Sequence, residues 1–236
     1  MIKKLSVFTV VFTLISFSIF SETITFSADS MTGTAGSKKD VTVLSGNACV
    51  KTSSMEIKAD SIELSGEDFR FITADGNVTG SNSESKMDFT CGKLKFDRIT
   101  KIARLEDSVN LIDMTNDVDA EAQLIEYNQT TEIAVMQIGV TLKQKDNTCT
   151  SAYAVYRKND QILEMSGNPK IIQGQDSFRA QEITLNLESQ EITLDGRVRG
   201  TVSDTKKEEK PAEKPVTEQE KTPAVEPSSE PEEVKA

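Results

Sequence analysis

The sequence predicts an all-β fold made of six stacked repeats of about 30 residues, and three observations lead to this fold class. The first is a five-residue phrase whose copies begin 30, 31, 31, 29 and 29 residues apart. A fixed period of this size is typical of stacked supersecondary units that cannot bury their apolar faces alone. The copies are L-S-G-N-A at 44–48, A-D-G-N-V at 74–78, L-E-D-S-V at 105–109, M-Q-I-G-V at 136–140, M-S-G-N-P at 165–169 and L-D-G-R-V at 194–198.

The second observation is a shorter phrase between successive copies of the first, in which a small residue is followed three and five positions later by apolar residues. Alternation of this kind indicates strands with one buried face. The third observation is that no long apolar stripe at helical spacing is present. The small residues that begin the second phrase are Ala28 in a degraded copy, Ala59, Cys91, Ala122, Ser151 in a looser copy, and Ala180.

The repeats lie between two segments of different composition. Residues 1–21 carry Lys3 and Lys4, then an apolar run over 5–20, which is typical of a cleaved secretory signal peptide. An uncleaved membrane anchor is the alternative, although the run is shorter than the ~20 residues that a spanning helix needs. Residues 203–236 are rich in Pro, Glu and Lys, so we expect a disordered acidic tail. Residues 22–202 remain as the repeat domain.

Composition excludes several classes of function. The net charge is −11 and there is no basic stripe, so nucleic acid is not an expected partner. The chain has no histidine, which removes Ser-His-Asp and Cys-His catalysis and the usual zinc sites. Alternating Asp117, Asp119 and Glu121 could bind calcium, but they lack the spacing of an EF-hand loop, and a solvated acidic face is preferred. We therefore predict no catalytic residue, no cofactor and no metal site, and a protein that is not an enzyme.

The three cysteines, Cys49, Cys91 and Cys149, leave two alternatives open. In an exported protein two of them could form a disulfide and leave one thiol over. Cys91 stands at the small-residue position of its repeat, which favours buried free thiols.

The phrase G-N-A-C-V at 46–50, followed by I-K-A-D-S-I-E-L at 57–64, resembles the LptA/OstA-like family. The resemblance covers roughly residues 24–202 and rests on the repetition and spacing of the motif. It implies spirally stacked antiparallel strands in a slightly open β-jellyroll, in a periplasmic protein that carries lipopolysaccharide from the inner to the outer membrane. Two copies have Asp107 with Ser108, and Ile138 with Gly139, in place of the usual Gly-Asn, so we expect distorted rungs there.

Apolar residues of one parity in the two phrases are expected to face the interior of the jellyroll. Glycines such as Gly46 and Gly76 share this parity and would leave room or allow a bend. The inward residues would either fill a core or line a groove for lipid acyl chains, and the resemblance favours the groove. The predicted groove-lining residues are Leu44, Ala48, Val50, Ile57, Ile62, Leu64, Val78, Phe89, Leu94, Phe96, Leu105, Val109, Ile125, Tyr127, Val140, Phe178, Ile183, Leu185 and Val198.

The resemblance implies a lipid-carrying bridge with three kinds of partner. These are lipopolysaccharide or a similar glycolipid, the transport complexes of the inner and outer membranes, and further jellyroll domains. Copies of itself or related domains would add head to tail through unpaired edge strands near 23–30 and 191–202. Two alternatives remain, an inner-membrane-anchored relay domain like LptC and a non-carrying β-repeat scaffold.

Overall fold

The computed structural model describes residues 23–33 and 41–203, which form one antiparallel sheet of 16 strands. A single 3-10 turn, η1 (Glu67–Phe69), is the one helical element among these residues, so the all-β prediction is confirmed. The predicted signal peptide and tail lie outside the described residues. The strands are β1 (Thr25–Ser27), β2 (Ser30–Gly33), β3 (Thr42–Lys51), β4 (Met55–Ser65), β5 (Phe71–Asn82), β6 (Met87–Asp97), β7 (Ile102–Asp113), β8 (Val118–Asn128), β9 (Ile133–Gln144), β10 (Asn147–Arg157), β11 (Ile162–Ser166), β12 (Lys170–Gln173), β13 (Asp176–Arg179), β14 (Glu182–Asn186), β15 (Ile192–Asp195) and β16 (Arg199–Thr201).

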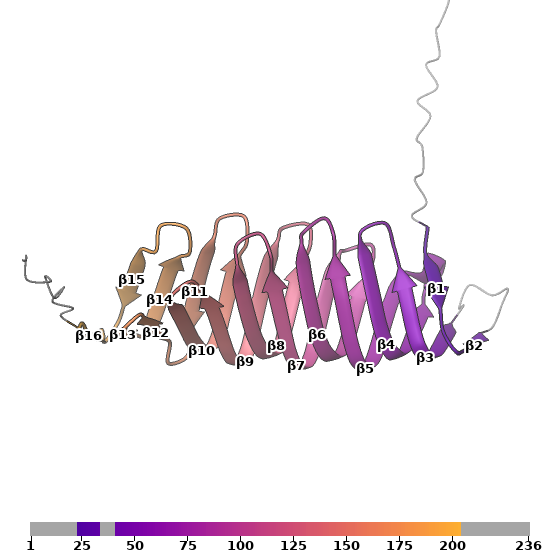
Figure 1. Ribbon diagram of the computed structural model, residues 1–236, viewed down its shortest axis with the longest axis horizontal. Coiled ribbons are helices and arrows are strands. Elements are labelled where there is room, and N and C mark those ends of the chain that lie inside the picture. The colour runs from indigo at the N-terminus through magenta and orange to yellow at the C-terminus, as the bar shows by residue number, and fades with distance from the viewer. Residues whose placement is uncertain (1–22, 34–40, 204–236) are drawn as a thin grey trace, which may run out of the picture. The chain divides into compact units, whose positions relative to one another are not determined.

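Strands β3 to β10 lie side by side in chain order, as the row of long hairpins in Figure 1 shows. Each end of this row carries two short strands on one long strand. The two halves of β3 pair with β1 and β2, and the two halves of β10 pair with β11 and β12. One branch then continues through β14 to β15, and the other through β13 to β16. This stack of similar hairpins is the architecture that the period of about 30 residues predicts.

The chain bends at every copy of the five-residue phrase. Two consecutive residues of each copy have positive φ: 46 and 47, 76 and 77, 107 and 108, 138 and 139, 167 and 168, and 196 and 197. In β3 the pairing with β4 shifts at this point, because two residues between Ser45 and Ala48 oppose one residue of β4. Such a β-bulge bends and twists a strand, and glycine adopts the left-handed conformation at the least cost. The repeated glycines therefore allow the strands to bend at these positions.

The two copies without Gly-Asn bend in the same way as the others. Asp107 and Ser108 have φ of 68° and 55°, and Ile138 and Gly139 have φ of 66° and 65°. The prediction of distorted rungs at 105–109 and 136–140 is therefore wrong. The backbone conformation is set by the pairing of whole strands, and the side chains at the bend only adjust its cost.

We name the six bends, with the residues of the preceding strand that face them, the bend ridge. Asn47 Nδ2 donates to Asp29 Oδ2 at 2.9 Å, and one repeat later Asn77 Nδ2 donates to Asp60 Oδ2 at 2.8 Å. A Cβ atom on Gly76 would lie only 2.4 Å from Asp60 Oδ2, so the glycine makes room for the aspartate.

The next repeat reverses this arrangement. Gly92 faces the bend from β6, and a Cβ atom placed on it would lie 2.7 Å from the Cβ of Asp107. The side chain therefore stands on the bend and the glycine on the facing strand. This exchange explains physically why the phrase at 105–109 has no glycine.

Buried side chains on one face of the sheet form a single apolar cluster that includes residues of β3 to β12 and of β14. In β4 the inward positions change parity at the bend, so that Ile57, Ala59, Ile62 and Leu64 are all buried. In the sequence this change is visible as the spacing of three residues between the small residue and the first apolar residue of the second phrase, since plain alternation would give a spacing of two.

The hairpin turns fall into two sets, one at each end of the long strands. Odd-numbered strands end at the first set, 52–54, 83–86, 114–117 and 145–146, and even-numbered strands end at the second set, 66–70, 98–101, 129–132 and 158–161. Half of these turns, and also the turn after β14, begin with an Asn or Asp whose side-chain oxygen accepts hydrogen bonds from the amides two and three residues ahead. These residues are Asn82, Asp97, Asp113, Asn128 and Asn186.

Candidate functional site

The apolar interior contains nearly all of the predicted groove-lining residues. Of the nineteen, seventeen are buried, most of them with no more than 3% of their surface exposed, while Phe178 is half-buried. Val198 is 53% exposed, so its inward placement was wrong. It lies after the last bend, in a part of the sheet where only β13 pairs with the following strand β16 and no further strand covers it.

In this conformation the interior is filled by the protein's own side chains. Leu44, Ile62, Leu94, Leu105 and Ile125 come from five different strands, and none of them is exposed to solvent. The interior is therefore a packed core whose walls are in contact. An acyl chain entering it has to displace these contacts or separate the walls.

A buried polar cluster, which we name the rim clasp, joins the two sets of turns. At its centre lies Asp113, the last residue of β7, with 1% of its side chain exposed. Its Oδ1 accepts hydrogen bonds from the amides of Thr115 at 2.9 Å and Asn116 at 3.3 Å. Its Oδ2 accepts from Tyr156 Oη at 2.8 Å and from Asn116 Nδ2 at 2.9 Å. Asp113 and Asn116 belong to the first set of turns, whereas Tyr156 lies beside the second.

Lys158 completes the rim clasp from the second set of turns. Its Nζ lies 3.3 Å from Asp113 Oδ1 and also donates to the backbone carbonyl of Ser85, which belongs to the first set. Its side chain is 6% exposed, and it is the only buried lysine or arginine in the described part of the chain. The rim clasp comprises Ser85, Asp113, Asn116, Tyr156 and Lys158.

A second group of contacts joins the first set of turns to the turn that follows β14 and involves amide side chains. Gln144 Nε2 donates to the carbonyl of Leu187 at 3.2 Å, and Gln190 Nε2 donates to Gln144 Oε1 at 3.1 Å. Asn147 Nδ2 donates to Gln190 Oε1. Together with the rim clasp, these polar contacts connect the turns that follow the strands from β5 to β14. The rest of the interior is held together by apolar contacts.

Two buried hydroxyl groups, one in the rim clasp and one next to it, have no hydrogen-bond partner among the described residues other than each other. They belong to Ser85 and Tyr127, which are 5% and 4% exposed and lie near each other. Burial raises the pKa of Tyr127 to about 12, and burial together with the hydrogen bond to Asp113 raises the pKa of Tyr156. Both phenols are therefore neutral at physiological pH and available as hydrogen-bond donors.

Sequence reasoning missed the rim clasp, although a signal for part of it is present. Asn82, Asp113 and Gln144 are polar residues at inward positions that end β5, β7 and β9, and they are 31 residues apart. A polar residue at a fixed inward position of each repeat marks a buried polar row. Lys158 has no such repetition, so its pairing with Asp113 could not have been found from the sequence.

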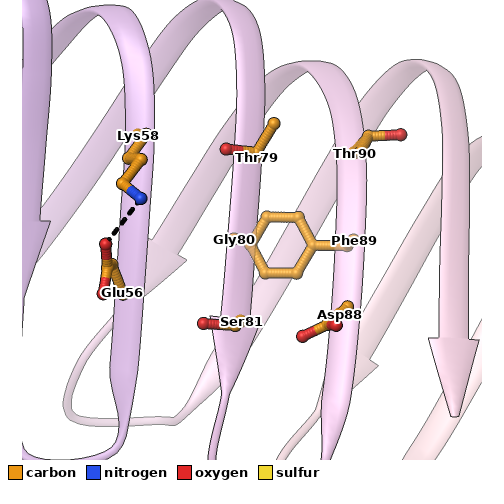
Figure 2. Close-up of a pocket in the computed structure, with 8 residues that line it drawn as sticks. All are labelled: Glu56, Lys58, Thr79, Gly80, Ser81, Asp88, Phe89 and Thr90. Atoms are coloured by element: carbon orange, nitrogen blue, oxygen red, sulfur yellow. Dashed lines mark ion pairs between the residues drawn. The ribbon is translucent and has the colours of Figure 1, made fainter. Parts of the chain in front are cut away.

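The outer face has an open hollow of about 270 Å³ between β4, β5 and β6. Figure 2 shows the ring of Phe89 lying across Gly80, and a Cβ atom on this glycine would lie 2.1 Å from the ring. Around it stand Thr79, Thr90 and the ion pair between Lys58 and Glu56, with Nζ and Oε1 2.8 Å apart. Polar side chains line the hollow together with Gly80 and Phe89.

The chemistry of thiols and carboxylates gives no indication of catalysis. Burial raises the pKa of Cys91 and Cys149 to about 12 and also raises that of Cys49, and all three are free thiols. No disulfide joins them, in agreement with the alternative that the sequence favoured. Within 23–33 and 41–203, no group of three or more side chains is placed to hold a metal ion.

Asp113 points inward and is separated from the other acidic residues of its neighbourhood. Asp119 on the outer face accepts a hydrogen bond from Asn110 Nδ2 at 2.6 Å, and Asp117 and Glu121 are exposed. Nor does the described part of the chain contain a helix of the length and hydropathy needed to span a membrane.

Comparison with known proteins gives one family. The sequence model described as OstA-like protein matches residues 21–198. Among solved structures, the chain is similar to LptH from Pseudomonas aeruginosa, described as the LptA homologous periplasmic component of the lipopolysaccharide transport device. The identity is 13%, the match covers 77% of this chain and 96% of that chain, and the TM-score is 0.23. No curated protein matches this chain.

Proposed function

Because the chain belongs to the OstA-like family, we propose that it is a periplasmic carrier of lipopolysaccharide or a related glycolipid. The acyl chains would lie in the apolar interior while the sugar headgroup stays outside, and the lipid would pass from the inner to the outer membrane. In this proposal residues 1–21 are a cleaved signal peptide, residues 22–202 are the carrier domain and residues 203–236 are a hydrophilic tail. The protein has no catalytic role.

The observation that carries the proposal is the continuity of the apolar interior. One cluster contains residues of every long strand from β3 to β10, and its members recur at equivalent positions of the repeats. Each buried methylene is worth ~0.8 kcal/mol, so a carrier has to keep acyl chains covered along its whole length. Repeated rungs of similar chemistry let a chain move from one to the next with little change in free energy.

The two ends of the sheet support transfer between domains. At one end every residue of β1 and β2 is exposed, and the side chains of Phe26 and Met31 are 46% and 59% exposed. At the other end β15 and β16 carry unpaired edges, near Val198 and Val202. Open edges of this kind add further strands, so copies of the protein or related jellyroll domains would join head to tail and extend the interior.

Photo-crosslinking tests the proposal at one pair of neighbouring positions. Phe89 is buried and Thr90, the next residue, is exposed. A benzophenone amino acid at position 89 replaces one aromatic ring by another and should capture glycolipid in cells, whereas the same residue at position 90 should not.

The filled interior favours one competing function, a non-carrying β-repeat scaffold. This scaffold predicts no glycolipid at either position, even in cells that make it abundantly. Capture at position 90 alone would also contradict the carrier, because it would place the lipid on the outer face.

A further inference from the structure

Two members of the rim clasp, Lys158 and Ser85, and the neighbouring Tyr127 have more hydrogen-bonding capacity than the protein uses. Lys158 Nζ has three N–H donors, and its two contacts are with Asp113 Oδ1 and the carbonyl of Ser85. The buried hydroxyls of Ser85 and Tyr127 lie close enough to pair with each other and have no other partner among the described residues. One N–H of the ammonium and one of the two hydroxyl protons are therefore left without an acceptor, and such unused donors around one buried cation could bind a ligand.

The contacts of Asp113 make Lys158 the replaceable member of the ion pair. Without Lys158, the carboxylate keeps four donors: the amides of Thr115 and Asn116, Asn116 Nδ2 and Tyr156 Oη. Three of these donors come from its own turn. Lys158 has a long flexible side chain, and an acceptor other than Asp113 could accept its hydrogen bond without leaving the carboxylate unpaired.

We propose that Lys158, Ser85 and Tyr127 form a binding site for the anionic headgroup, a phosphate or a carboxylate, of an amphiphile whose acyl chain enters the interior at the rim. The ammonium turns from Asp113 to the headgroup, and the two hydroxyls donate the remaining hydrogen bonds. This inference rests on the proposed function and adds to it the charge of the ligand and the place where it enters.

The position of the site fits such a ligand. Lys158 and Ser85 belong to opposite sets of turns, so breaking their contacts separates the two ends of the strands and opens the apolar interior between them. The same event therefore frees the cation and exposes apolar surface. An amphiphile with a negative head and an apolar chain can pair with the cation and cover the apolar surface, whereas one with a neutral head can only cover the apolar surface.

Two acidic residues face the site and limit which ligands it accepts. Asp113 and Glu132 both lie close enough to Tyr127 to raise its pKa. The charge of Asp113 remains compensated by its four other donors, and Glu132 lies in a partly exposed turn. Because of these two carboxylates, an anion is expected to bind only when its acyl chain also contributes burial.

The test compares two probes with the same chain, decyl phosphate and decyl maltoside, below their micelle concentrations and by titration calorimetry with the whole protein. The wild-type protein should bind decyl phosphate about tenfold more tightly, the size expected of charge-assisted hydrogen bonds. The Lys158→Met variant should lose this preference but should still bind decyl maltoside. Lys143→Met, which removes an exposed lysine from β9, should leave the preference unchanged.

Two further variants keep the inference testable if Lys158→Met does not fold. Lys158→Arg retains the charge and should keep most of the preference, and Ser85→Ala should lower it about threefold by removing one neutral donor. A preference that survives both Lys158→Met and Ser85→Ala would overturn the site, as would a wild-type protein that binds the two probes equally. Binding of neither probe by the wild-type protein would instead overturn the carrier function itself.

Discussion

The bend ridge lies in the middle of the long strands, whereas the rim, by which we mean the two sets of turns, lies at their ends, and the two regions are built by different means. At the bend ridge the same backbone conformation recurs six times, and short polar pairs such as Asn77 with Asp60 stabilise it at the surface. At the rim a buried ion pair joins residues that are 45 positions apart in the chain, Asp113 and Lys158. The bend ridge is uniform because the same conformation repeats, whereas the rim depends on contacts that occur only once in the molecule.

The largest effect is expected from removing the carboxylate of the rim clasp. Asp113→Ala leaves the Lys158 ammonium buried without a counter-charge and should lower the free energy of unfolding by about 3–5 kcal/mol. Lys158→Met should cost less, because Asp113 keeps its four other donors. Urea unfolding followed by circular dichroism measures both.

The control for this comparison is Asp88→Ala, which removes a carboxylate from the outward face of β6. Its cost should stay within about 0.5 kcal/mol. Equal costs for Asp113→Ala and Asp88→Ala would mean that the rim clasp does not hold the turns together.

A smaller loss is expected at the bend ridge from Gly76→Ala. The residue has φ of 79°, and its new Cβ would lie 2.4 Å from Asp60 Oδ2, so the free energy of unfolding should fall by about 2–3 kcal/mol. Gly174→Ala is the matched control, since Gly174 has φ of 59° with nothing within 4 Å of the added Cβ. It should lose only the conformational part, about 1 kcal/mol.

Combining Gly76→Ala with Asp60→Gly tests whether the facing residue causes the difference. The pair reproduces the exchange that Gly92 and Asp107 already show in the next repeat. The double variant should therefore recover about 0.5 kcal/mol or more relative to the sum of the single changes, which is the coupling typical of residues in contact. Strict additivity would refute the steric account of the bend ridge.

A gain in stability is expected at the strained position of the bend ridge. Ile138 is a β-branched residue with φ of 66° and a 63% exposed side chain, where four of the other repeats have glycine. Ile138→Gly should raise the thermal unfolding midpoint, with a gain of about 1 kcal/mol from relief of the left-handed strain. Ile112→Gly, at an exposed position of β7 without positive φ, should instead be destabilising.

The smallest effect is expected in acid, at an ion pair away from the rim clasp. The Arg70 guanidinium, whose Nη2 lies 2.6 Å from Asp97 Oδ2, holds the pKa of Asp97 well below its usual range. A depressed carboxyl pKa stabilises the fold above the unfolded value of about 3.9, and this contribution is lost as the pH falls further. Asp97→Asn should therefore reduce the dependence of the urea midpoint on pH below about pH 4. An unchanged pH dependence would mean that the pair is only a surface contact.

The bend ridge could be predicted from the sequence, and the rim could not. Every copy of the five-residue phrase marks a bend, and the spacing of three in the second phrase marks the change of parity at residues such as Ala59 and Ile62. These features repeat because each depends only on neighbouring strands. The rim clasp depends on how far the strands bend toward each other, which sets the partner of Lys158 and which no local pattern records.

The interior illustrates the same limit. The parity of the residues predicted that side chains such as Leu94 and Leu105 face inward, and both are fully buried. The sequence could not tell whether the facing walls are in contact, because this depends on side chains from distant strands. The prediction that Val198 faces inward was wrong for a related reason. Its parity is that of a buried residue, but no further strand covers it.

Hydrogen exchange of the wild-type protein, measured by mass spectrometry with and without decyl phosphate, tests the central claim most directly. The claim is that an amphiphile enters by opening the rim while the bend ridge acts as a fixed hinge. Decyl phosphate should therefore speed exchange at the amides of 114–117 and 158–161 and leave those of 45–48 and 75–78 unchanged. Faster exchange at the bends with unchanged turns, or no change at either while the probe is bound, would contradict it.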